Sequence, residues 1–310
     1  MYHIIINPAS RSGAGKKLWK TIVEPYLMEH KIEYISYFSE QEGDVAKLAA
    51  KITKDTYADA PRKLVVLGGD GTVNEALQGI QDFRAVTLGY IPTGSSNDFA
   101  RDLGIPKDTL KAVKQVFETG TAHKMDVGYV TFSDGTKRYF AVSCGMGFDA
   151  AVCEETNRSA FKKALNRIKL GKLAYLVIAV KQLLAAKSAD CEITLDANPS
   201  FTIKKYLFSA SMLHRYEGGG FKFCPDAKSD DGIIDFCTAA TKLPKLVILM
   251  VLPTAFFGKH YLFPGITPYK AKTIHIKASA PLWIHTDGEI LRKDNELTVS
   301  CQRRVLTVIH

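Results

Sequence analysis

The sequence lacks the features that define several classes of protein. Its six cysteines include no C-x-x-C pair, so neither a zinc site nor a disulfide framework is indicated, and a reducing cytosol is the expected compartment. The longest apolar run, residues 246–257, has 12 residues and contains Pro253. A membrane-spanning helix needs ~20 residues, and the N-terminal apolar run is too short for a signal peptide. We therefore expect a cytoplasmic protein whose membrane contact is peripheral.

The charge and the length of the chain indicate an anionic partner and two domains. The formal net charge is +9 and the isoelectric point about 9.1. Such a charge favours nucleic acid, an anionic membrane surface or a phosphorylated substrate, without choosing among them. A chain of 310 residues exceeds the usual size of a single core. The hydrophobic content of 46% is ordinary for a folded protein, so disorder is not expected.

A buried strand runs into a glycine-rich turn at residues 64–72. Four aliphatic residues precede Gly68-Gly69-Asp70-Gly71-Thr72, and the sequence after this turn has helical composition. Glycines let main-chain amides converge on an oxyanion at a helix N-terminus. Asp70 cannot itself bind phosphate, so we expect it in an exposed turn, reaching Mg²⁺ or its water shell while Thr72 caps the helix. The alternative is a tight turn with no ligand.

A second candidate loop, residues 7–17, follows the strand predicted over residues 2–6. Its sequence, NPASRSGAGKK, fails the P-loop pattern twice, and it also fails G-x-G-x-x-G. A basic loop of small residues remains. Within it, Asn7, Ser10, Ser12 and the loop amides could contact a nucleotide, and Lys16 could neutralise phosphate.

A third candidate loop is PTGSSNDFAR, residues 92–101. Small hydroxyl residues surround Gly94, while Asn97 and Asp98 could cap a short helix or bind ribose, phosphate or a metal-bound water. Strands and helices alternate through residues 2–91, which predicts a doubly wound parallel sheet with its ligand at the carboxyl ends of the strands. All three loops fall at that edge.

These three motifs in order, NPASRSGAG, GGDGTVNE and PTGSSNDFAR, resemble the diacylglycerol kinase catalytic domain of soluble bacterial lipid kinases, which is related to sphingosine kinases. GGDGT alone also occurs in NAD kinases. The sequence NPASRSG departs from NP-x-S-G of many members, so the match of Lys16 to a family lysine stays open. The candidate nucleotide-binding residues are Asn7, Pro8, Ser10, Arg11, Ser12, Gly13, Lys16, Ser39, Gly68, Gly69, Asp70, Gly71, Thr72, Asn74, Glu75, Thr93, Gly94, Ser95, Asn97 and Asp98.

The resemblance also implies a magnesium site in PDAKSDDG, residues 225–232. It assigns the metal to Asp231, with the carbonyl oxygens of Lys228 and Ile233 as co-ligands and Asp230 beside them. Asp126 is expected near the metal network. From the residues alone, Asp-Asp-Gly before a strand is equally consistent with an ordinary turn.

The late turn Asp287-Gly288-Glu289 is the position of the general base in the resembling family. Phosphoryl transfer needs a carboxylate that accepts the proton of the attacking hydroxyl. The sequence does not rank Asp287 against Glu289, and Asp70 is the third candidate catalytic residue. Alternation along the preceding strand places Trp283, His285 and Asp287 on one face.

From Tyr129 onward the pattern changes to β, with a hairpin at 129–143 and strands near 191–195, 201–211 and 233–237. Helices are predicted over 173–186 and 243–257. We predict a first, nucleotide-binding domain at residues 1–127 plus 296–310, and a β-sandwich, lipid-binding domain at 128–295. A basic helix at 158–172 carries Arg158, Lys162, Lys169 and Lys172 beside an apolar stripe, and it suits either an anionic membrane or a solvated surface.

Together these features predict an ATP- and Mg²⁺-dependent lipid kinase, acting on diacylglycerol or a related lipid. The rival hypotheses are an NAD kinase and a non-enzymatic, basic nucleotide-binding regulator. The expected partners are the lipid substrate and an anionic membrane surface, not nucleic acid. A homodimer stays open.

Overall fold

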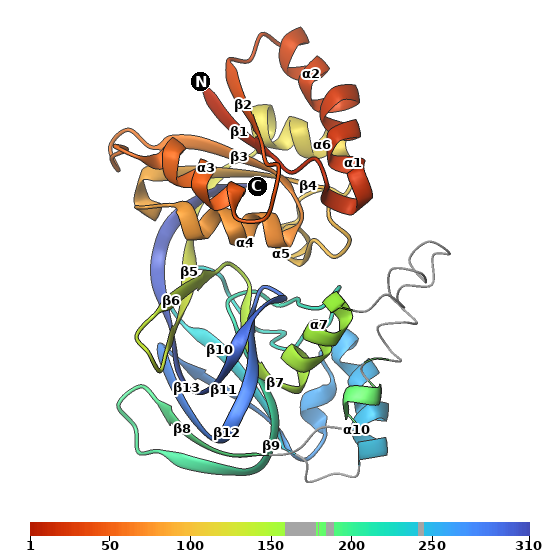
Figure 1. Ribbon diagram of the computed structural model, residues 1–310, viewed down its shortest axis with the longest axis vertical. Helices are drawn as coiled ribbons and strands as arrows, with labels where there is room; N and C mark the ends of the chain where they lie inside the picture. The colour runs from red at the N-terminus through yellow and green to blue at the C-terminus, as the bar shows by residue number, and fades with distance from the viewer. Residues whose placement is uncertain (159–177, 179, 184–188, 241–244) are drawn as a thin grey trace.

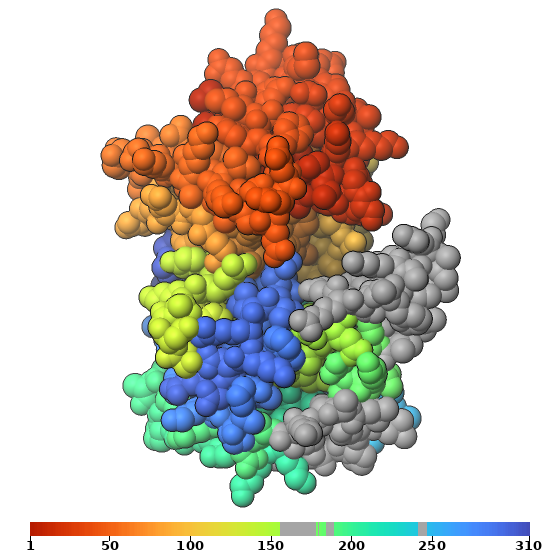
Figure 2. Space-filling model, viewed as in Figure 1, coloured from red at the N-terminus to blue at the C-terminus, as the bar shows by residue number. Residues whose placement is uncertain are grey.

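The computed structural model describes residues 1–158, 178, 180–183, 189–240 and 245–310. Two lobes follow one another along the long axis of the molecule (Figures 1 and 2). The predicted basic helix lies outside the described residues except for residue 158, as does most of the predicted helix over 173–186. Within the described part, no helix combines the length and the apolar character needed to cross a bilayer.

The first lobe is the predicted doubly wound α/β domain. Strand β1 pairs in parallel with β2 and β3, and β3 pairs in parallel with β4. Helices cover this sheet (Figure 1). Its elements are β1 (Tyr2–Ile6), α1 (Ser10–Leu18), η1 (Trp19–Val23), α2 (Glu24–Glu29), β2 (Tyr34–Phe38), α3 (Asp44–Thr53), β3 (Arg62–Gly68), α4 (Asp70–Gly79), η2 (Phe83–Ala85), β4 (Val86–Pro92), α5 (Asp98–Asp102), α6 (Thr109–Lys114) and η3 (Gln115–Thr119).

The aliphatic run of β3 explains why this sheet forms the centre of the lobe. Residues 64–67 are at most 1% exposed, as a strand covered on both faces requires. Helices α3 and α4 pack together at Gly79, where an added β-carbon would overlap the carbonyl oxygen of Ala46. Glycine therefore lets the two helices approach at this point.

The second lobe is the predicted β-rich, sandwich-like domain, and its strands pair antiparallel. All six cysteines are free. Its elements are β5 (Ala122–Phe132), β6 (Lys137–Phe140), β7 (Ser143–Gly147), α7 (Phe148–Arg158), β8 (Ala189–Leu195), β9 (Phe201–Met212), β10 (Ile234–Ala240), α10 (Lys245–Val251), η4 (Leu252–Phe257), η5 (His260–Leu262), β11 (Ile266–Ala271), β12 (Thr273–Thr286) and β13 (Glu289–Ile309).

One strand, β13, joins the two lobes. Its 21 residues pair antiparallel with β5 and β12, and residues 307–309 then pair in parallel with β4. A single hydrogen-bonded sheet thus runs through both lobes. The domain limits at residues 127 and 296 fall inside the long strands β5 and β13, and they stay a prediction.

The helix predicted over residues 243–257 changes from α-helix to 3₁₀ helix in its second half. The α-helix α10 ends at Val251, and a 3₁₀ helix, η4, follows with Pro253 near its start. Proline has no N–H to continue the α-helical hydrogen bonds. Gly258 then takes a φ of 68°, which ends the segment. Residues 243 and 244 lie outside the described part.

Candidate active site between the lobes

The three predicted nucleotide loops meet at the carboxyl edge of the parallel sheet. Ile6 lies beside Leu67, and Gly68 beside Pro92, so the loops after β1, β3 and β4 leave the sheet together. The Asn7 side-chain amide donates to Thr72 Oγ1 at 3.1 Å. The Ser10 and Thr93 hydroxyls are 2.7 Å apart. Side chains from all three loops therefore form one surface.

Close approach of two main chains requires the glycines of these loops. A β-carbon added to Gly69 would lie 3.2 Å from the Cα atom of Gly94. At Gly68, an added β-carbon would overlap the side chain of Thr72, whose hydroxyl accepts a hydrogen bond from the Gly69 N–H at 3.3 Å. The two turns are thus packed backbone to backbone at the start of α4. This geometry leaves an edge of main chain and small side chains at a helix N-terminus, which suits phosphate.

The prediction that Asp70 lies in an exposed turn is wrong. Its carboxylate accepts the N–H groups of Asp98 and Phe99, at 3.0 and 3.4 Å, at the start of α5. Burial, with the nearby negative charge of Asp98, raises the pKa of Asp70 to about 7. Asp70 therefore fixes the third loop to the second. The excess of negative charge here is also what a bound Mg²⁺ would relieve.

Asp98 extends this connection into the second lobe. It is 4% exposed, pairs with Arg101, and accepts the Gly219 N–H at 2.6 Å. Burial raises the pKa of Asp98. One helical turn further on, Asp102 accepts hydrogen bonds from His214 Nδ1 and Arg215 Nε, at 2.8 and 2.7 Å. Both ends of α5 thus contact the second lobe.

The remaining nucleotide candidates differ in their surroundings. Arg11, Ser12 and Gly13 are exposed, and they form a non-helical break inside α1, with φ angles of 48°, 58° and 93°. Ser39, in contrast, is buried, and its N–H donates to the Ile6 carbonyl. Glu75 accepts the Val45 N–H at 3.0 Å, a contact between α3 and α4. The last two therefore have structural partners already, and the exposed loop residues are better placed to contact a ligand. Pro8 and Lys16 belong to the same candidate loop, residues 7–17, and Ser95 to the loop after β4.

The carboxylate of Asp287 is enclosed by hydrogen-bond donors. Three consecutive N–H groups, of residues 141–143, donate to it at 2.8–2.9 Å. Asn74, which is fully buried on α4, adds its side-chain amide at 2.8 Å. Arg138 in turn donates to the side-chain oxygen of Asn74, Oδ1, at 2.9 Å. A carboxylate has about four acceptor positions, so these donors occupy its hydrogen-bonding capacity.

Glu289 reaches across to the glycine-rich turn of the first lobe. A β-carbon added to Gly71 would overlap Glu289 Oε1. Although the residue is exposed overall, desolvation of its carboxyl group and the charges of Glu42 and Asp287 raise the pKa of Glu289, against the opposing charge of Arg138. The late acidic turn and GGDGT, predicted to meet, are therefore in contact.

The acids of the predicted magnesium site form a separate group beside β5 and β13. Asp126 accepts the N–H groups of Gly232 and Arg304, both at 2.7 Å. Burial and the charges of Asp231 and Asp230 raise the pKa of Asp126. The electrostatic neighbours of Asp70 are instead Asp98 and Asp287. Asp230 pairs with Arg304 at 3.0 Å, and Asp231 accepts the Ile233 N–H at 2.9 Å. The predicted magnesium ligands therefore lie at a distinct place from the glycine-rich turn, and the metal there stays a prediction.

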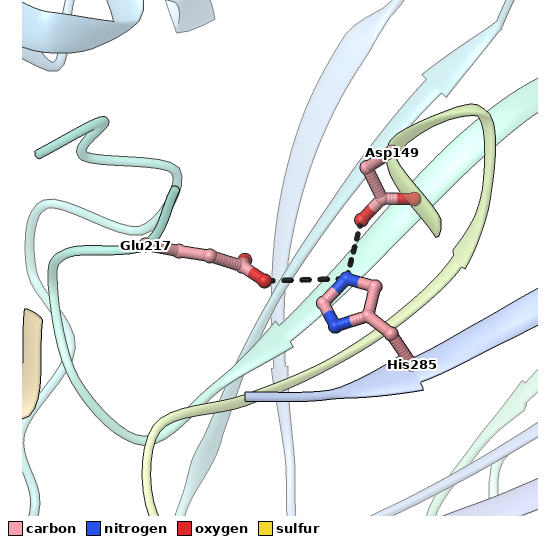
Figure 3. A group of neighbouring side chains, drawn as sticks. All are labelled: Asp149, Glu217 and His285. Atoms are coloured by element: carbon pink, nitrogen blue, oxygen red, sulfur yellow. Dashed lines mark hydrogen bonds and ion pairs between the residues drawn. The ribbon is translucent and has the colours of Figure 1, made fainter. Parts of the chain in front are cut away.

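A buried cluster that the sequence did not predict lies behind the late acidic turn (Figure 3). His285 Nε2 is 3.1 Å from Asp149 Oδ2 and 3.2 Å from Glu217 Oε1. Within the described ranges, these are the three His, Cys, Asp or Glu residues whose ligand atoms converge within 4.8 Å. Burial raises the pKa of Glu217 to about 7. Only His285 had been noted from the sequence, because the other two residues lie far away along the chain.

The hydrogen bonds of this cluster favour a support for the turn over a metal site. The Gly288 N–H donates to His285 Nδ1 at 3.2 Å, which leaves the ring proton on Nε2. A cation on the two carboxylates would need the Nε2 lone pair, so this tautomer opposes it. Ser143 links the cluster to Asp287, because its hydroxyl donates to Glu217 and its N–H to Asp287.

Two family models cover most of the chain. The diacylglycerol kinase catalytic domain matches residues 1–130, and the YegS C-terminal NAD kinase beta sandwich-like domain matches residues 142–310. The chain belongs to the diacylglycerol kinase catalytic domain family. It is therefore a kinase, and the family suggested by the three motifs is confirmed.

Similar proteins support membership of this diacylglycerol kinase family over nearly the whole length. A diacylglycerol kinase of Staphylococcus aureus is 32% identical, covering 92% of this chain and 85% of its own. A diacylglycerol kinase of Mycobacterium tuberculosis is 27% identical, with 92% and 87% covered. The crystal structure of a diacylglycerol kinase from Bacillus anthracis shares the fold, with a TM-score of 0.71, 21% identity, and 100% and 96% covered.

Proposed function

We propose that this kinase transfers the γ-phosphoryl group of ATP, with Mg²⁺, to the hydroxyl group of diacylglycerol or a related lipid. The product would be phosphatidic acid or the corresponding phosphorylated lipid. The observation that carries the proposal is the contact of Glu289, from the second lobe, with Gly71 of the glycine-rich turn. A base for the acceptor and a cradle for the donor phosphates then lie on facing sides of one site.

Glu289 is the better candidate for the general base. A base needs a free lone pair toward the hydroxyl it deprotonates. The two carboxylate oxygens of Asp287 already accept hydrogen bonds from three main-chain N–H groups and from the side chain of Asn74. Glu289 is exposed toward the turn, and its raised pKa improves it as a proton acceptor. Asp287 is then a positioning residue, which holds the turn that carries Glu289.

The reaction follows from these positions. Main-chain amides of the glycine-rich turn would hold phosphate at the start of α4, and Asp70 and Asp98 are the carboxylates that would hold a cation bound with the nucleotide. When bound, Mg²⁺ neutralises charge on the phosphate oxygens. The lipid hydroxyl oxygen bonds to the γ-phosphorus while the bond to the ADP oxygen breaks. Glu289 takes the hydroxyl proton.

The choice of a lipid as acceptor is supported by the relatives and by one cavity. The relatives described above are named as diacylglycerol kinases. An apolar cavity of about 40 Å³ lies in the second lobe, and its lining includes Phe208, Phe223 and Ile248. It is smaller than an acyl chain and would have to widen to admit one. NAD, the acceptor in the rival hypothesis, offers nothing to fill such a site.

The test measures transfer of label from γ-labelled ATP to diacylglycerol dispersed in detergent, to a lipid extract and to NAD. We expect label in the lipid, dependence on Mg²⁺, and a loss of about a hundredfold or more in kcat for Glu289→Gln, the usual contribution of a general base. The matched control is Glu296→Gln on the same strand, which should keep full activity. Label in NADP alone, or an unchanged rate in Glu289→Gln, would contradict the proposal.

A further inference from the structure

The largest exposed apolar side chains of the second lobe gather in one short segment. Among the described residues, Met250, Phe256, Phe257 and Leu262 are 68%, 44%, 75% and 78% exposed. They lie on α10, η4 and η5, in the part of the second lobe away from β1 and β2 (Figure 1). We call residues 250–262 the apolar ridge. Concentrated exposure of this kind marks an interaction surface, unlike single exposed residues.

The exposed side chains of the apolar ridge are held by buried neighbours. Ala255 is 1% exposed, and its carbonyl accepts the Lys222 N–H at 2.8 Å. His260 is 3% exposed, 3.1 Å from the Phe223 carbonyl, and Tyr261 donates to the same oxygen. The ridge is therefore anchored to the lobe at several points. The exposed apolar side chains of the ridge therefore project from a segment whose backbone is fixed to the rest of the lobe.

The charge around the apolar ridge fits an anionic surface. The ridge itself, residues 250–262, contains no Asp or Glu. Lys259 is exposed within the ridge itself. Lys222 lies against it, since an added β-carbon on Gly258 would be 3.9 Å from the Lys222 Cβ atom. Apolar side chains flanked by lysines are the pattern of a segment that lies in the interface of an anionic bilayer.

The apolar ridge also connects the apolar cavity with the candidate active site. On its inner side, Val251, Leu252 and Ala255 line the cavity. Phe256 stacks on Phe221, with ring centroids 3.9 Å apart. Two residues before Phe221, the Gly219 N–H donates to Asp98 of the candidate active site. A surface contact, an apolar interior and the candidate active site thus follow one another over a short stretch of packed residues.

We infer that the apolar ridge is a membrane-docking surface, which places Phe257, Leu262 and Met250 at the acyl boundary of an anionic bilayer. This inference rests on the proposed function, because an enzyme that phosphorylates a lipid has to reach its substrate in a membrane. The ridge holds the cavity and the candidate active site next to the surface from which the substrate is taken. The basic residues predicted at 158–172 are not needed for it.

The test is co-sedimentation with vesicles of phosphatidylcholine, with and without phosphatidylglycerol. The double variant Phe257→Ser/Leu262→Ser should bind at least about tenfold more weakly, since two large side chains no longer leave water. Lys259→Glu should lose binding mainly to the anionic vesicles. The control, Met28→Ser/Tyr57→Ser, removes two apolar residues of the first lobe that are each 68% exposed, and it should bind like wild type.

Activity on diacylglycerol in detergent micelles separates docking from chemistry. The ridge variants should keep their micellar kcat within about twofold, because their residues lie outside the candidate active site. Vesicle binding needs no turnover, so it can succeed or fail whatever the wild type phosphorylates. Unchanged vesicle binding, an equal loss in the first-lobe control, or a dimer in sedimentation that the double variant abolishes would overturn the inference.

Discussion

The two sides of the candidate active site are built differently. On the first lobe, the site consists of short turns in which neighbouring residues of the chain supply main chain and small side chains. On the second lobe, Asp287 depends on donors 144–146 residues earlier in the chain and on Asn74, 213 residues away. The proposed phosphate-binding turns are thus built from residues that are close together in the sequence, whereas the position of the proposed base depends on contacts between distant parts of the chain.

The substitution Asp287→Asn tests this difference between the two sides most strongly, and we expect it to have the largest effect. An asparagine side chain has one acceptor oxygen, and its amino group would face N–H donors that now bind a carboxylate. Each unpaired buried donor costs about 1–3 kcal/mol, so we expect a clear fall in thermal stability as well as activity. Thermal unfolding of this variant and of Glu289→Gln gives the contrast. Only Asp287→Asn should unfold earlier, and equal melting temperatures would contradict the positioning role.

A second prediction concerns the contact across the candidate active site. In Gly71→Ala, the new methyl group would meet the flexible end of Glu289 and displace its carboxyl group. Alanine suits a helix better than glycine, so stability should hold while kcat falls by about tenfold. The matched variant Gly79→Ala, on the same helix, meets the main chain of Ala46 and should lose stability instead. Kinetics and unfolding of both variants would show whether the two glycines have these separate roles.

The smallest expected effect is on the pH dependence of stability. Burial would raise the pKa of Asp102, but hydrogen bonds from His214 and Arg215 outweigh it and lower that pKa. Because the pKa of Asp102 is lower in the folded protein than the value of ~4 in the unfolded chain, its ionised form stabilises the folded state at pH values above ~4. This stabilisation is lost as the pH falls through the folded-state pKa. Asp102→Asn should therefore flatten the acid limb of the stability curve. Denaturant unfolding between about pH 3 and 6 measures this, and an unchanged acid limb would count against this link between the lobes.

The part of the site that could be predicted is the part that is local in sequence. Glycines after a buried strand, hydroxyl residues around Gly94 and the β/α alternation each carry their own signal, so the three loops were placed at one edge. The burial of Asp70 was missed because its partners are main-chain groups of another loop. Glu217 lies 68 residues after Asp149, and His285 lies 68 residues after Glu217, so no local sequence pattern connects the three residues.

The continuity of β13 through both lobes limits how this enzyme can close on its substrates. Lobes that share hydrogen-bonded strands cannot slide past one another, so a change in their angle must be a bend of the strands. The pairing of β13 with β5 loses register between Gln302 and Leu306, and Arg304 there has a φ of 51°. At this point Asp126 accepts the main-chain N–H of Arg304 and Asp230 accepts its guanidinium, so the acidic turn holds the chain where the strand is irregular.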